Sequence, residues 1–172
     1  MYSQVQTQKK VIDALVVDRD SIRIKLENQL QYTRRNMLFI HGVGEKARED
    51  TDKVVLEVAE KVGVNLDQKN INRSHRLGPK RQNLDKKPRP IILSLISYAQ
   101  KKELYDNKKK LKGTKIFISE SLTQSRCALY EKCIERFGKN NCWTYDGRIF
   151  CVNPEDDNAK LCIESDEDLA NI

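Results

Sequence analysis

In this 172-residue chain, the residues whose types and spacing indicate a binding role are aromatic and basic. The octamer NMLFIHGV holds a phenyl ring, Phe39, and an imidazole, His41, two residues apart. If the octamer is a strand, both rings lie on one face, because side chains alternate along a strand. In proteins that bind single-stranded nucleic acid, a ring on an exposed sheet face can stack on an unpaired nucleobase. We therefore expect a base-stacking site at Phe39, and a bulky residue on an ordinary strand is the alternative.

Positive charge is concentrated in the middle of the chain. Residues 68–118 carry 15 Lys or Arg against three acids, whereas residues 153–172 carry seven acids and one Lys, within a net charge of +7. A concentrated basic segment favours a polyanionic partner, and a lysine-rich solvated surface is the alternative. Arginines are the better candidates, because the planar guanidinium matches phosphate.

The candidate RNA contacts combine these two chemistries. They lie before and on the octamer, on the strand before residue 80, on the loop that follows it, and in the C-terminal part. The set is Arg34, Arg35, Phe39, His41, Arg73, Arg76, Lys80, Arg81, Lys86, Lys87, Arg89, Arg126, Tyr145 and Arg148. If about six phosphates are neutralised, log affinity should fall by roughly 0.7 per contact for each decade of salt.

Signatures of catalysis and of metal binding are missing from the sequence. It contains no paired carboxylates beside a histidine, no Gly-rich phosphate loop and no nucleophile motif. The five cysteines form no CxxC pair and lie far from both histidines, so we expect buried apolar thiols and no metal or cofactor. No apolar run approaches the roughly 20 residues of a membrane span, and the N-terminus lacks the apolar central region of a signal peptide. We expect a non-enzymatic intracellular protein without a membrane partner.

The first thirty residues contain no Gly or Pro and carry a heptad pattern. Apolar residues and one arginine recur at spacings of seven and three, which predicts a coiled-coil segment over residues 1–34. The stripe consists of Val5, Ile12, Leu15, Arg19, Ile22 and Leu26. Self-association through this stripe is the expectation, and a single amphipathic helix packed on the rest of the protein is the alternative.

Residues 35–119 predict an α+β unit with the order strand, helix, strand, strand, helix, strand. The predicted elements are strands 37–42, 71–77, 90–97 and 115–119 and helices 50–62 and 97–111. This is the ferredoxin-like βαββαβ order of RNA-recognition (RRM-like) modules. The strand PIILSLIS carries no aromatic residue, where such modules usually have one, so charge must supply most of the binding.

Residues 120–172 predict a small α+β C-terminal domain. Ser121 and Gln124 have capping-box spacing before a helix that Gly138 ends. Asp146-Gly147 between two aromatic-rich runs predicts a type I′ β-hairpin. Trp143 on this hairpin is expected to be a core anchor. A short strand follows, and Ser165 should cap a terminal helix.

Several stretches resemble one known family when they are taken in order. The resemblance is carried by LENQLQYTRRNMLFIHGVGE, INRSHRLGPKR, RPIILSLISYAQKKELYDNKKKLKGTKIFISESLTQSR and WTYDGRIFCV. Together they resemble the RNA-binding protein encoded by the first open reading frame of LINE-type non-LTR retrotransposons. The resemblance spans essentially the whole chain. Family members often carry a basic residue where this chain has Phe39 or Ser94, which favours stacking over charge at the sheet here.

The resemblance implies a coiled-coil homotrimer that coats single-stranded RNA in a cleft between its two globular units. It also implies nucleic-acid chaperone activity within a cytoplasmic ribonucleoprotein. Nuclear entry and binding of single-stranded DNA are compatible with this expectation. The implied contacts fall near Arg35, Arg76, the 80–89 loop and Arg126. Two alternatives remain open from the residues: a non-enzymatic protein-interaction module with an RRM-like fold and a coiled coil, and a domesticated cellular RNA-binding protein.

Overall fold

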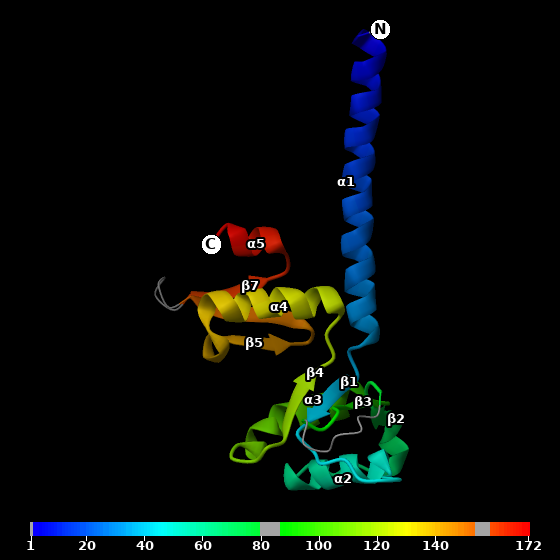
Figure 1. Ribbon diagram of the computed structural model, residues 1–172, viewed down its shortest axis with the longest axis vertical. Coiled ribbons are helices and arrows are strands. Elements are labelled where there is room, and N and C mark those ends of the chain that lie inside the picture. The colour runs from blue at the N-terminus through cyan, green and yellow to red at the C-terminus, as the bar shows by residue number, and fades with distance from the viewer. Residues whose placement is uncertain (1, 80–86, 154–158) are drawn as a thin grey trace.

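The structure is a computed structural model that describes residues 2–79, 87–153 and 159–172. A long helix projects away from two smaller parts, and each of these combines helices with an antiparallel sheet (Figure 1). The α+β class and the long N-terminal helix are therefore confirmed. Two separate clusters of buried hydrophobic residues lie in the two parts.

Helix α1 (Tyr2–Thr33) is long and largely solvent-exposed. The apolar heptad residues from Val5 to Leu26 are each between 54% and 63% exposed. The alternative in which this stripe packs on the rest of the protein is therefore wrong, and only the C-terminal end of α1 reaches the two smaller parts (Figure 1). No helix in the described part of the chain is both long and apolar enough to cross a membrane.

The first sheet has the strand order β2-β3-β1-β4, with all neighbours antiparallel. Its strands are β1 (Met37–His41), β2 (Ile71–Arg76), β3 (Ile91–Leu95) and β4 (Phe117–Glu120). Helices α2 (Thr51–Lys61) and α3 (Tyr98–Asp106) cover one face, because Val55 and Leu104 share a core with Leu38 and Leu93. The alternate residues of the strands form the opposite face, which no helix of the described residues covers. The helix predicted as far as Leu111 is α-helical to Asp106 and continues as the 3-10 helix η2 (Asn107–Leu111).

The second sheet has the order β5-β6-β7 and packs against helix α4. Its elements are α4 (Gln124–Phe137), β5 (Cys142–Tyr145), β6 (Arg148–Asn153) and β7 (Ala159–Ile163), followed by the short helix α5 (Asp166–Ala170). Short 3-10 helices η1 (Gln68–Asn70) and η3 (Lys139–Asn141) precede β2 and β5. Asp146 and Gly147 have φ values of 51° and 72°, as the predicted type I′ turn requires.

The structure confirms some of the features predicted in the C-terminal part and contradicts others. Ser165 caps α5, as predicted. The capping box predicted at Ser121 is wrong, because Thr123 is the N-cap of α4 and accepts a hydrogen bond from the Arg126 amide. Trp143 is only partly buried and stacks on Phe150 at 5.9 Å, outside the buried cluster. The thiols of Cys133, Cys142 and Cys151 are buried as expected, whereas those of Cys127 and Cys162 are exposed.

Candidate nucleic-acid interface

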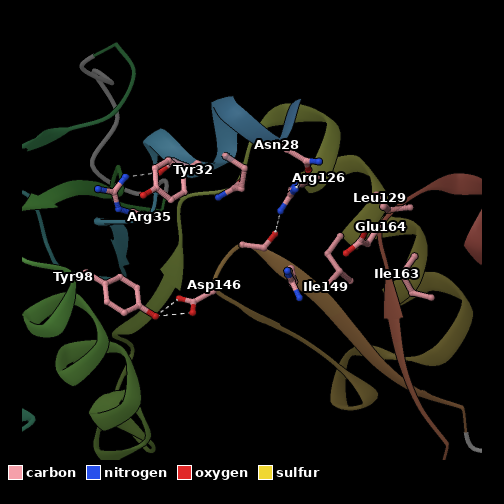
Figure 2. A pocket seen from close by; sticks show the side chains of 13 residues that line it. Asn28, Tyr32, Arg35, Tyr98, Arg126, Leu129, Asp146, Ile149, Ile163 and Glu164 are labelled. Carbon is pink, nitrogen blue, oxygen red and sulfur yellow. Dashed lines mark hydrogen bonds between the residues drawn. The ribbon is translucent and has the colours of Figure 1, made fainter. Parts of the chain in front are cut away.

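A cleft of about 680 Å³ lies where the end of α1, the start of α3, helix α4 and the β5–β6 hairpin meet (Figure 2). Three arginines that the sequence predicted as RNA contacts line it from separate segments: Arg35, Arg126 and Arg148. Two tyrosines, Tyr32 and Tyr98, line it as well. The fold therefore brings together guanidinium groups from residues more than a hundred positions apart in sequence.

Arg126 connects the walls of this cleft. Its Nη2 donates a hydrogen bond of 2.7 Å to Asn28 Oδ1 of α1, and its Nη1 donates to the carbonyl oxygen of Gly147 in the hairpin. The carboxylate of Glu27 lies 3.7 Å from its Nε. Because these groups already satisfy much of the guanidinium, Arg126 mainly holds the cleft in shape.

Arg35 and Arg148 are more accessible. Both are exposed, and the Arg35 guanidinium lies over the Tyr32 ring at 4.1 Å from its centroid. Tyr32 is itself 63% exposed, so both members of this stacked pair line the cleft and remain open to solvent. An arginine stacked on an aromatic ring keeps its in-plane donors for a phosphate.

The cleft also contains negative charge. Asp146 and Glu164 line it, and Asp146 accepts hydrogen bonds from the Tyr98 hydroxyl at 2.7 and 2.6 Å (Figure 2). Because the Asp146 carboxylate accepts these bonds from the protonated hydroxyl, it raises the pKa of Tyr98 above its ordinary value. With three arginines against two carboxylates, the cleft is less basic than the charge of the central segment suggests.

A buried network of polar side chains lies beside the cleft and reaches it at Gln31 and Gly147. Lys101 Nζ lies 2.6 Å from Glu120 Oε1, and both side chains are 3% exposed. Glu120 Oε2 accepts a hydrogen bond from the Gly147 amide at 3.2 Å. Gln31 donates to the Ser121 carbonyl and accepts from the Thr123 amide, at 3.0 and 2.9 Å. These bonds tie α1, the first sheet and the hairpin together.

The helix-free face of the first sheet carries the predicted rings. The register places Phe39 beside Ile92 and Ser119, and His41 beside Phe117. Burial lowers the pKa of the His41 imidazole, which also lies 3.0 Å from the Ser119 hydroxyl. The ring of Phe117 stacks on His41 with centroids 4.3 Å apart and planes 4° apart. The candidate set omitted Phe117, although strand alternation with buried Ile118 would have placed it on this face.

Two of the predicted arginines make internal ion pairs. Arg76 is 5% exposed in its side chain and donates to both oxygens of Glu49, at 2.7 and 3.0 Å. Arg89 donates to both carboxylate oxygens of Glu45. The bond from Arg76 lowers the pKa of Glu49. These arginines fasten the β1–α2 loop to the sheet in this structure.

The remaining candidates are spread over the first sheet and the hairpin. Arg73 and Lys87 are exposed, and Tyr145 is 38% exposed at the end of β5. Arg34 is partly buried and donates to the Ser121 hydroxyl at 3.3 Å. Lys80, Arg81 and Lys86 lie outside the described residues.

A scan against protein-family models finds no match for this chain, and neither does a search of curated proteins.

Proposed function

We propose that this chain binds single-stranded RNA in the cleft between its two smaller parts, with low sequence specificity and without catalysing a reaction. The observation that carries the proposal is the meeting of exposed Arg35 and Arg148 in one cleft, which Arg126 holds in shape and which also contains two tyrosine rings. Guanidinium groups bind backbone phosphates, and tyrosine rings stack on bases of any identity. Single-stranded DNA offers the same groups and is the expected second ligand.

The first sheet supports an RRM-like interpretation of residues 35–119. The chain order β1-α2-β2-β3-α3-β4 and the sheet order β2-β3-β1-β4 agree with a ferredoxin-like unit. The exposed heptad stripe of α1 favours self-association, because several large apolar side chains stay in water in a single chain. Together with the resemblance to the LINE-type protein, these features favour a homotrimeric nucleic-acid chaperone in cytoplasmic ribonucleoprotein particles.

Salt dependence tests the cleft. Replacing Arg35 and Arg148 with Ala removes two exposed phosphate donors, so the slope of log affinity against log salt should become shallower by about 1.4. Fluorescence anisotropy with a labelled 20-nucleotide oligouridylate measures the slope. The matched control replaces with Ala both Lys53 and Lys61, two exposed lysines of α2, a helix that contributes no residue to the cleft. The control loses the same charge and should keep most of the slope.

A protein-interaction module is the second candidate, because the two carboxylates in the cleft reduce its positive charge. The same titration separates the two functions. Absence of oligonucleotide binding by the unmodified chain at low salt would favour the interaction module. Equal slopes for the cleft variant and the α2 variant would place RNA binding elsewhere on the chain.

A further inference from the structure

The rings of β1 and β4 form a second aromatic surface on the first sheet. Phe117 is 57% exposed, although its ring stacks on His41 at 4.3 Å and nearly in parallel. Phe39 lies 6.0 Å from His41 on the same helix-free face. One face of the Phe117 ring is therefore covered by an imidazole, while the side chain as a whole still presents apolar area to solvent.

This surface lies at the opposite end of the first sheet from the cleft. Register pairs Leu38 with Glu120 near the cleft, whereas His41 pairs with Phe117 three residues further along β1. The stacked and neighbouring rings are those of Phe39 and His41 on β1 and Phe117 on β4, so this surface does not depend on β3, which lacks an aromatic residue. A further imidazole, His75 of β2, lies on the same face, because it pairs with Ile92 beside Phe39.

Positive charge adjoins the rings. Lys112 and Lys115 are exposed in the segment that leads into β4, and Lys115 lies two residues before Phe117. Its backbone packs closely on the end of β1, because a Cβ at Gly42 would lie 1.8 Å from the Lys115 carbonyl oxygen. Arg73 is also exposed, but it lies on the opposite edge strand, where it pairs with Ser94 in register with Met37, at the other end of β1 from His41. An aromatic surface with exposed lysines at its β4 border complements a strand with stacked bases and a phosphate backbone.

We infer that Phe117, supported by His41, is a stacking site for an unpaired base of single-stranded nucleic acid, separate from the cleft. The inference rests on the proposed nucleic-acid binding and adds a contact at the far end of the sheet. His41 is a positioning residue here, since it covers one face of the Phe117 ring. Lys115 lies where it can neutralise an adjacent phosphate.

The test compares two substitutions on two strands. Phe117→Leu keeps apolar bulk without a π face, and Phe117→Tyr keeps the ring. The full-length chain is titrated with a labelled 20-nucleotide oligouridylate and with an abasic strand of the same length. Phe117→Leu should weaken oligouridylate binding by roughly 5- to 150-fold, the range for loss of one stacked base, and leave abasic-strand binding unchanged. Phe117→Tyr should bind oligouridylate like the unmodified chain.

Other outcomes would overturn the inference. Equal binding of oligouridylate by Phe117→Leu and the unmodified chain would show that no base stacks there. An equal loss on both strands would show that Phe117 does not act through bases. If the unmodified chain binds neither strand at low salt, the proposed function itself fails, and the inference fails with it. Urea unfolding of the variants controls for folding, which should change little because Phe117 is exposed.

Discussion

At the scale of single residues, Glu49 and Glu45 determine how Arg76 and Arg89 act. Each arginine has a carboxylate partner and further backbone acceptors, and Arg76 also donates to the Val43 carbonyl at 2.8 Å. Removing one partner of a pair as buried as Arg76 and Glu49 typically costs about 3–5 kcal/mol, because the other charge stays buried without compensation. Substitution of Arg76 would therefore test folding more than RNA binding. Exposed Arg35 and Arg148 are the better probes.

His41 should make stability depend on pH. Burial lowers its pKa in the folded state from the ordinary value of 6.5, so the unfolded chain binds a proton more readily. The contribution of His41 to stability is then fully present above pH 6.5 and decreases as pH falls through 6.5 towards the folded-state pKa. Urea unfolding at pH 7.5, 6.5 and 5.5 should show a smaller loss of stability for His41→Gln than for the unmodified chain. Parallel pH dependences would show that the imidazole titrates alike in both states.

At the scale of elements, α1 contains more exposed apolar residues than one heptad stripe needs. Besides the stripe, Val17 and Ile24 are 67% and 63% exposed. In the predicted register these two residues lie opposite the a and d positions, on the outer side of a coiled coil. The helix therefore carries both the residues that test self-association and residues of the same type that serve as controls.

Charge in the heptad stripe should abolish self-association. Ile12→Asp with Ile22→Asp would bury carboxylates between helices, which is strongly unfavourable without a partner charge. Molar mass from light scattering should fall from the value of an oligomer, expected to be a trimer, to that of one chain. Val17→Asp with Ile24→Asp adds the same charge on the outer side and should leave the oligomer intact. A monomeric unmodified chain, or equal dissociation of both variants, would contradict the assigned stripe.

At the scale of the whole molecule, one buried ion pair couples the first sheet to the C-terminal part. Glu120 bonds Lys101 and the hairpin amide of Gly147, and Lys101 also lies 3.5 Å from Asp146. Tyr105 adds a hydrogen bond of 2.8 Å to the Thr144 carbonyl. These contacts place the hairpin beside α3, next to the cleft.

Breaking this pair should destabilise the protein. Lys101→Met leaves Glu120 buried without its cation and should cost about 3–5 kcal/mol in urea unfolding. Adding Glu120→Gln removes the isolated charge but keeps an acceptor for the Gly147 amide, so the double variant should recover much of the loss. A double variant no more stable than Lys101→Met would show that the charge pair is not what couples the two parts.

Local patterns in the sequence determined several secondary-structure elements of this protein. The heptad spacing, the alternation in MLFIH and the Asp146-Gly147 turn depend on neighbouring residues, so the long helix, β1 and the hairpin could be predicted. The concentration of basic residues also follows from sequence alone. The carboxylates beside Arg76 and Arg89, the stacking of Phe117 on His41 and the meeting of Arg35, Arg126 and Arg148 were decided only by the tertiary structure. These contacts join residues distant in sequence, and their distances depend on how helices and strands pack, which no local pattern records.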